Sequence, residues 1–183
     1  MQRKFALWIS IVIALSVCAC ATLLGPREVN LPLSRLQESL DRKFPFTQRY
    51  FQIFEVNLSH PQLALLPETN RIGVTLDAML TVPFAKQAWQ GKLSLSGGLL
   101  IDQARQAIVL TDTRIDRLNL QGIDNAYAGQ LARIGDQLTQ QFLNNLPLYT
   151  FKPGDFSYAG ARFTPTRITT GSNSLVVTFE PAK

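Results

Sequence analysis

The sequence predicts an α+β fold in which a curved antiparallel sheet wraps around a long helix in the C-terminal half, with a short helix near the N-terminus. Apolar residues alternate at every second position through much of residues 50–120, which is the period of strands that bury one face. Apolar residues recur every three or four positions in 33–44 and 123–146, which is the period of amphipathic helices. A sheet with one apolar face needs a partner, and the longer helix supplies it.

The first predicted element is the helix over residues 33–44. Pro32 suits its first turn, and Pro45 ends it. Its apolar positions are Leu33, Leu36, Leu40 and Phe44. The residues before it, 22–30, contain Gly25 and Pro26 and are expected to form a short tether.

The middle of the chain predicts an antiparallel meander. Strands are expected over residues 50–58, 71–82, 91–101 and 107–113, and apolar residues continue toward Gly122. Turn-forming residues at 67–70 and 102–105 keep the connections short, as antiparallel neighbours require. Gly97 and Gly98 predict a bulge or bend that lets the third strand curve.

The helix over residues 123–146 is the longest predicted element. Its stripe is Ile123, Tyr127, Leu131, Ile134, Leu138 and Phe142, extended by Leu143 and Leu146, and Pro147 stops it. Roughly 23 residues at about 1.5 Å each would span about 35 Å, the length of a domain. Two closing strands follow, at 149–152 and 175–179, separated by a connection rich in Gly, Pro, Ser and Thr.

The N-terminus has the features of an export signal, because Arg3 and Lys4 precede an uncharged, mostly apolar run over 5–17. As a helix this run would extend about 20 Å, which is too short for a hydrocarbon core of roughly 30 Å. Val-Cys-Ala-Cys at 17–20 resembles the lipobox of bacterial lipoproteins, with Cys20 as the acylated residue. Cys18 follows the large Val17 and fits less well. Cleavage without acylation, and an uncleaved anchor extending to about Leu24, stay open as alternatives.

These features predict three regions: a lipoprotein signal peptide at 1–19, a lipidated tether at 20–30, and a single periplasmic domain at 31–183. Several acyl chains on Cys20 would hold the domain stably at a membrane. Ala21 follows the cysteine in place of Asp, and resemblance to enterobacterial sorting then favours the outer membrane. The predicted location is the bacterial envelope, facing the periplasm.

Charge argues against a nucleic-acid partner. The formal net charge is +5, and without residues 1–19 it is +3, from 16 basic and 13 acidic residues. Arg42 and Lys43 are adjacent, but the other basic residues are scattered, so no basic stripe is predicted. A solvated surface is the expected role of these residues, with weak attraction to anionic lipid as the alternative.

The residues that commonly carry catalysis form no recognisable motif. His60 is the only histidine and is expected in a surface loop, so neither a zinc site nor a Ser-His-Asp triad is predicted. Asp112 and Asp116 would lie roughly 13 Å apart on an extended strand, too far for a glycosidase pair, and Arg114 lies between them. We expect no enzyme, no cofactor and no metal.

A small group of aromatic residues lies near one strand connection. Pro83, Phe84 and Trp89 flank the polar Lys86 and Gln87. They are expected either under a strand edge or at an exposed lip that faces a membrane or a channel mouth.

The order of elements resembles that of the YceB-like lipoproteins. The resemblance is carried by Leu36-x3-Leu40, the strand at 93–101, the run LTQQFLNNLPLY at 138–149 and LVVTF at 175–179, and it covers nearly all of the chain after the signal. That family has no settled activity. Its fold is similar to that of the tubular lipid-binding (TULIP) proteins, in which a curved sheet wraps a long helix and leaves an apolar channel.

The resemblance implies a membrane-tethered lipoprotein that binds a lipid or another long apolar ligand, in envelope maintenance or lipid transfer. The implied channel residues are Leu36, Leu40, Phe54, Val56, Leu76, Leu80, Leu95, Leu99, Tyr127, Leu131, Ile134, Leu138 and Phe142. The residues alone favour a simple packed core over a channel. The alternative function is therefore a scaffold that binds another envelope protein and no ligand. An internal cavity of at least roughly 300 Å³ would distinguish the two.

Overall fold

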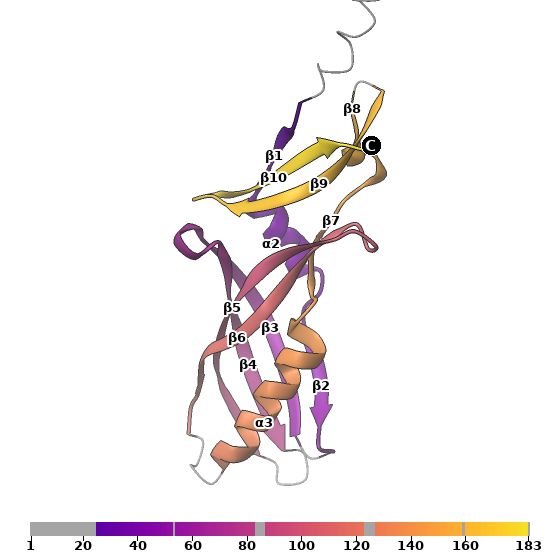
Figure 1. The fold of residues 1–183 in the computed structure, drawn as a ribbon. Helices are drawn as coiled ribbons and strands as arrows, with labels where there is room; N and C mark the ends of the chain where they lie inside the picture. The colour runs from indigo at the N-terminus through magenta and orange to yellow at the C-terminus, as the bar shows by residue number, and fades with distance from the viewer. Residues whose placement is uncertain (1–24, 53, 83–86, 123–126, 159, 183) are drawn as a thin grey trace, which may run out of the picture.

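The computed structural model describes residues 25–52, 54–82, 87–122, 127–158 and 160–182. Within these ranges the strands form two antiparallel sheets, one of four strands in the order β1-β10-β9-β8 and one of six in the order β2-β3-β4-β5-β6-β7 (Figure 1). The first sheet contains β1 (Arg27–Pro32), β8 (Ser157–Tyr158), β9 (Ala161–Thr170) and β10 (Ser174–Pro181). The second contains β2 (Phe46–Tyr50), β3 (Phe54–Leu66), β4 (Arg71–Val82), β5 (Gln87–Asp102), β6 (Ala107–Leu120) and β7 (Pro147–Thr150).

The six-stranded sheet is the predicted meander. Each strand from β2 to β6 pairs with its neighbour in sequence, and β4 has the predicted bounds. Its even-numbered residues are buried and its odd-numbered ones are partly or fully exposed, because strand side chains alternate. The expected strand at 50–58 is confirmed over 54–58, which is the start of β3, but its first residues are wrong, since Phe51 and Gln52 have positive φ and form the turn between β2 and β3.

The two central glycines of β5 cause the predicted irregularity. The register between β5 and β6 shifts between Ser96 and Gly98. A Cβ at Gly97 would lie 2.7 Å from Leu110 Cδ1, so a larger residue would push β6 away. The bulge lets the sheet curl, and the expected bend is confirmed.

The N-terminal helix is confirmed as α2 (Leu33–Asp41), which ends three residues before the predicted end. Leu36 and Leu40 are fully buried on the face that the spacing predicted. Pro32 is the N-cap in extended conformation.

The prediction of a long helix over residues 123–146 is wrong. The helix α3 (Ala128–Leu138) has 11 residues, and a π-helical turn η4 (Thr139–Leu143) follows it. Asn144 is extended and Asn145 has φ 65°, so the chain turns toward β7 there. Gly129 and Gly135 inside α3 also weaken the helix, since glycine has the most conformational freedom to lose. The first predicted positions, 123–126, lie outside the described residues.

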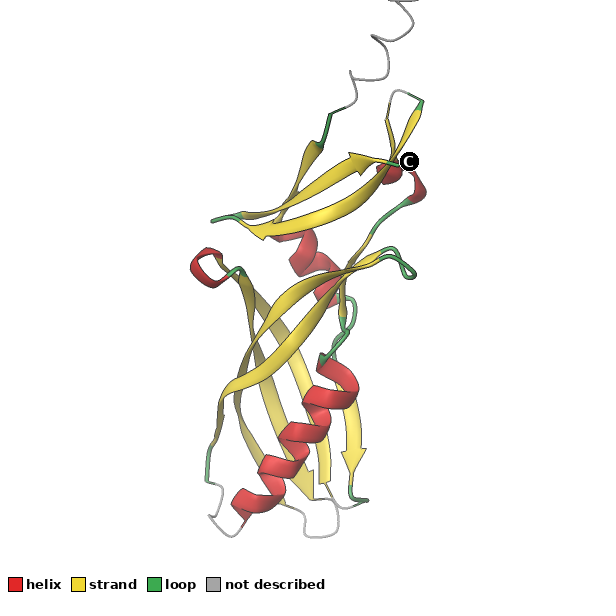
Figure 2. Cartoon of the chain, in the orientation of Figure 1, coloured by secondary structure: helices red, strands yellow, loops and turns green. Residues whose placement is uncertain are grey.

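The predicted fold class is wrong as well, because the structure is mostly β (Figure 2). The curved sheet does not wrap a long helix. Of the two expected closing strands, the one at 149–152 is present as β7, which pairs with β6 in the six-stranded sheet. The one at 175–179 lies in β10 and does not join that sheet. Instead β9 and β10 form a second sheet with β1, which occupies residues 27–32 where a tether was expected. β9 lies in the connection that was expected to be irregular. Pro165 and four threonines obscure its alternation, so the sequence pattern does not reveal this strand.

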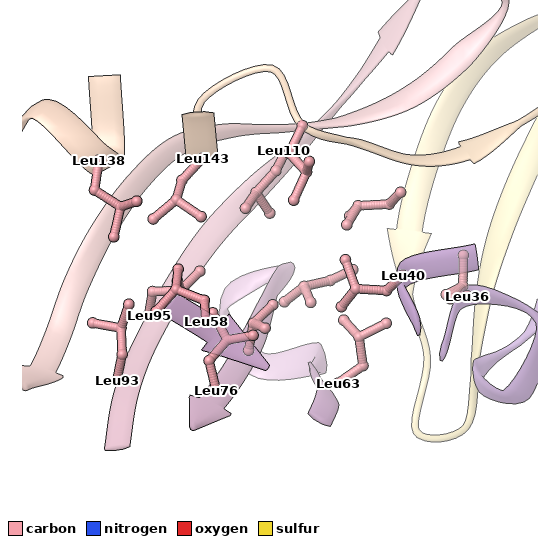
Figure 3. Close-up of a cluster of buried hydrophobic side chains, with 14 of the residues drawn as sticks. Leu36, Leu40, Leu58, Leu63, Leu76, Leu93, Leu95, Leu110, Leu138 and Leu143 are labelled. Atoms are coloured by element: carbon pink, nitrogen blue, oxygen red, sulfur yellow. The ribbon is translucent and has the colours of Figure 1, made fainter. Parts of the chain in front are cut away.

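One continuous core joins the two sheets through α2. A row of leucines runs from Leu138 at the end of α3 and Leu93 on β5 to Leu36 and Leu40 on α2 (Figure 3). Side-chain amides fix this junction. Gln37 on α2 donates to Pro61 O at 2.6 Å and accepts from Leu63 N–H at 2.9 Å, both on β3. Asn70 beside β4 accepts from Thr170 N–H on β9 at 2.7 Å.

Candidate functional site

The inner face of the six-stranded sheet is a continuous apolar surface. Cross-strand pairing places Val56 opposite Leu80 and Leu58 opposite Ala78, and on the next strands Leu93 lies opposite Leu118. These side chains share one face because antiparallel partners directly opposite each other point the same way. The alternation in β3, β4 and β5 therefore builds the apolar face directly from the sequence.

Helix α3 covers this face with its own apolar stripe. Ile134 and Leu138 are buried, and Leu131 is partly buried, as expected for residues three or four apart on one side of a helix. Gly135 lies on the same side, and a Cβ there would come within 3.1 Å of Ile115 Cδ1 on β6. The helix therefore lies close against β6 at this point.

A narrow apolar slit remains between α3 and the sheet. Its lining residues are Val56, Leu58, Ala78, Met79, Leu80, Leu93, Ile115, Leu118, Leu120, Leu131, Ile134, Gly135 and Leu138, none of which has a charged side chain. The cavity volume of the slit is about 30 Å³. That is room for about one water molecule, whereas a ligand pocket needs roughly 300 Å³. In this conformation side chains fill the space that the resemblance expected to be a channel.

The slit opens to solvent along β6. Strand β7 pairs with β6 at Ala107, Ile108 and Val109, so within the described residues the second half of β6 has a strand on one side alone. Leu118 in this half is 39% exposed although it faces the slit. The mouth is therefore bounded by the free edge of β6 and by α3.

Apolar contacts hold α3 in place. Among the described residues, no hydrogen bond or ion pair joins a side chain of α3 to a strand. Thr139, just after the helix, donates to Gly135 O within the helix at 2.9 Å. The π-helical turn that follows contains Leu143, which is buried. Movement of α3 would therefore break apolar contacts but none of the polar bonds found in the described ranges.

An aromatic cluster lies next to the slit, where Trp89 on β5 pairs with Leu80 on β4. Trp89 and Tyr127 have ring centroids 5.2 Å apart, and Phe54 meets Tyr127 edge-on at 6.5 Å. The indole N–H of Trp89 donates to Gly122 O at 3.2 Å. Trp89 is thus buried under the strand edge and does not form an exposed lip. Pro83 and Phe84 lie outside the described residues.

Five of the predicted channel residues line the slit: Val56, Leu80, Leu131, Ile134 and Leu138. Leu36 and Leu40 instead pack between the sheets, Leu76 and Leu95 are core residues, and Leu99 borders a groove next to β9. Phe54 and Tyr127 belong to the aromatic cluster. Cys20 and the side chain of Phe142 lie outside the description.

Sequence reasoning missed the other eight residues that line the slit: Leu58, Ala78, Met79, Leu93, Ile115, Leu118, Leu120 and Gly135. Leu58, Ala78 and Leu93 each lie two positions from a predicted residue on the same strand face, so their alternation was visible in the sequence. The pattern alone did not show which part of that face α3 would cover.

The outer face of the sheet carries a separate polar groove of about 410 Å³ around His60, Asp77 and Lys92. Asp77 is 3.2 Å from His60 Nδ1 and 3.1 Å from Lys92 Nζ. The hydrogen bond from Lys92 is the main cause that lowers the pKa of Asp77, and His60 adds to it. His60 lies in β3 at the bulge after Ser59, not in a loop, and its side chain is 80% exposed.

The carboxylates considered from the sequence pair with arginines. Asp112 accepts from Arg71 at 2.7 Å, and Asp116 lies 3.5 Å from Arg114. Asp112 has φ 45°, at a bulge of β6. Across the described ranges no group of three metal-ligating side chains gathers, and no helix there is long and apolar enough to cross a membrane.

These features define a mostly β protein whose six-stranded sheet has an apolar face covered by a short helix. The sequence model of DUF1439, described as a protein of unknown function, matches residues 34–171, and the chain belongs to this family. No curated protein matches the chain.

Among solved structures, the crystal structure of lipopolysaccharide binding protein matches with 15% sequence identity and a TM-score of 0.24. The match covers 86% of this chain and 50% of that one, so the chain spans about half the length of that protein. A TM-score this low does not establish a common fold.

Proposed function

We propose that the protein binds an acyl chain or a similar long apolar ligand between α3 and the inner face of the six-stranded sheet. The observation that carries the proposal is the slit itself, because its lining has no charged side chain and its mouth opens to solvent along β6. The closed slit holds about 30 Å³. The ligand therefore enters only when α3 lifts from the sheet.

The contacts of α3 keep the free-energy cost of this opening low. Lifting the helix exposes apolar surface at about 25 cal/mol per Å², and an acyl chain that takes its place covers the same surface again. A buried polar group that loses its hydrogen-bond partner costs about 1–3 kcal/mol. Among the described residues no side chain of α3 has a hydrogen-bond partner on a strand, so the opening does not carry this cost. The ligand therefore replaces one set of apolar contacts by another.

The sequence supports a membrane location for this binding. We propose that residues 1–19 form an export signal, that Cys20 is acylated, and that the domain faces the periplasm, at the outer membrane. The YceB-like resemblance supports the same location. The protein acts in this proposal as a binding protein without catalysis, in envelope maintenance or lipid transfer.

Acylation is tested by intact-mass spectrometry of the membrane-extracted full chain. Cys20→Ser should abolish both processing and the mass of the acyl chains, whereas the matched control Cys18→Ser should keep both. An unchanged mass in Cys20→Ser would reject acylation at this residue.

Ligand binding is tested by replacing two alanines with leucine, one in the slit and one outside it. Ala78 is buried and lines the slit, while Ala132 lies exposed on the solvent side of α3. The full chain and both variants are purified from bacterial cells, extracted with organic solvent without hydrolysis, and analysed for lipid by mass spectrometry.

Ala78→Leu should reduce the lipid per chain severalfold, because the leucine fills the slit, and Ala132→Leu should leave it unchanged. Both variants share the N-terminal anchor, so lipid that associates with the anchor cancels in the comparison. Circular dichroism confirms that each variant is folded. Equal amounts of lipid in all three proteins would reject binding in the slit.

A second function, a scaffold that binds another envelope protein and no ligand, is favoured by one observation. The volume of the slit is about 30 Å³. A solid core would show a void of this small size, far below that of a ligand pocket. Equal lipid in the three proteins, combined with a protein partner crosslinked in intact cells, would favour this function.

A further inference from the structure

The chain enters the fold at the end of the molecule that carries β8 and the start of β1 (Figure 1). Gly25 is the first described residue, and the residues before it include the apolar run 5–17 and Cys20. The chain from Cys20 to Arg27 spans at most about 25 Å when it is fully extended. A chain anchored at Cys20 therefore keeps this end of the four-stranded sheet near the bilayer.

The side chains at this end suit a bilayer surface. Tyr158 is 55% exposed, and the guanidinium carbon of Arg27 lies 3.3 Å above the centre of its ring. Arg162 is exposed on β9 opposite Ser157. Within the described residues neither arginine forms an ion pair. Tyrosine is enriched at membrane interfaces, and guanidinium groups bind phosphates through charge-assisted hydrogen bonds.

The opposite end of the molecule lies far from this surface. Strand β4 has 12 residues. It extends about 40 Å at the usual rise of a strand. It leads from the junction of the sheets toward the turn after β2 (Figure 1). Phe51 lies in that turn and is 46% exposed, so an aromatic residue of similar exposure marks each end.

From these positions we propose that Tyr158, Arg27 and Arg162 dock on an anionic bilayer and hold the molecule upright, so that the slit is held at a distance from the membrane that anchors the protein. The proposal rests on the membrane tether proposed above. Tyr158 lies at the level of the headgroups, and the two arginines contact phosphates. The slit then lies in the half of the molecule that is remote from the anchoring membrane.

Depth-dependent fluorescence quenching tests the orientation. The full chain is reconstituted into vesicles of phosphatidylglycerol and phosphatidylethanolamine with brominated acyl chains, carrying either Tyr158→Trp or Phe51→Trp. The unsubstituted chain provides the emission of the protein's own tryptophans, which is subtracted. Flotation of the vesicles first measures whether the chain is attached.

The emission added by Tyr158→Trp should be quenched at least about threefold more than that added by Phe51→Trp, since interfacial aromatic residues lie next to the acyl chains. Adding Arg27→Glu should reduce that quenching. A chain that does not float overturns the tether and the docking with it. A chain that floats but shows equal quenching at both ends overturns the docking and leaves the tether intact.

Discussion

The two α-helices in the described part of the chain, α2 and α3, pack on the same sheet in different ways. Helix α2 combines fully buried leucines with polar bonds, because Gln37 both donates to and accepts from the backbone of β3. Helix α3 has apolar contacts to the sheet but, among the described residues, no polar bond from its side chains to a strand. Directional bonds fix one arrangement, whereas apolar contacts are equally satisfied by another apolar partner.

The difference indicates which helix is structural and which can move. Displacing α2 would leave the backbone groups of Pro61 and Leu63 without partners, at about 1–3 kcal/mol each. Displacing α3 exposes apolar surface that a ligand can cover. We therefore expect α2 to hold the two sheets together and α3 to act as the cover of the slit.

Truncating one leucine on each helix tests this comparison most strongly. Leu40→Ala, at a fully buried position on α2, should lower the free energy of unfolding by about 2–5 kcal/mol. Leu131 on α3 is partly buried. Leu131→Ala should lower the free energy of unfolding by about 1 kcal/mol, because less apolar surface is lost. Urea denaturation measures both. Equal losses would show that α3 is as firmly packed as α2.

The polar bonds of α2 provide the second test. Gln37→Ala should cost about 1–3 kcal/mol, since it removes an exposed bond to Asp41 and two bonds to β3, and leaves two backbone groups of β3 unsatisfied. Gln103→Ala is the matched control, because Gln103 is exposed and makes one bond, to Pro165 O at 2.9 Å. Its cost should be about 0.5 kcal/mol or less. A neutral Gln37→Ala would mean that packing alone holds α2.

Much of the six-stranded sheet and α2 could be predicted because their patterns are local. Alternation in β4 and the spacing of Leu36 and Leu40 each reflect one buried face. The glycine bend was also visible, since Gly97 is needed where β6 approaches closely.

The second sheet and the true length of α3 could not be predicted because they depend on distant residues. Strand β1 pairs with β10 across nearly the whole sequence, and a six-residue strand beside Gly25 and Pro26 resembles a tether. The apolar stripe at 123–146 continues past Leu143, but Leu146 belongs to the connection that bonds to Leu110 on β6. Periodicity alone does not reveal that the helix has ended.

The intrinsic stability of α3 provides a third, smaller test. Gly129 lies on its exposed side with no atom within 4 Å of an added Cβ. Gly129→Ala should therefore stabilise the helix by about 0.5–1 kcal/mol. Hydrogen exchange of the α3 amides should slow, and uptake of an acyl ligand should slow with it. Gly154→Ala, equally unobstructed but in a short 3-10 turn, should leave α3 exchange unchanged. Faster ligand uptake in Gly129→Ala would contradict the role of α3 as a cover.

The smallest expected effect concerns the outer face, where an ion pair braces β4 against β6. The hydrogen bond from Arg71 lowers the pKa of Asp112 from its ordinary value of 3.8. Because the folded value is the lower one, the stabilising contribution is present above pH 3.8 and is lost as the pH falls below it. Asp112→Asn should therefore flatten the acid limb of urea midpoints measured against pH, and Asp136→Asn on the exposed side of α3 controls for the lost charge. An acid limb as steep as that of the wild type in Asp112→Asn would show that this pair does not brace the bulge.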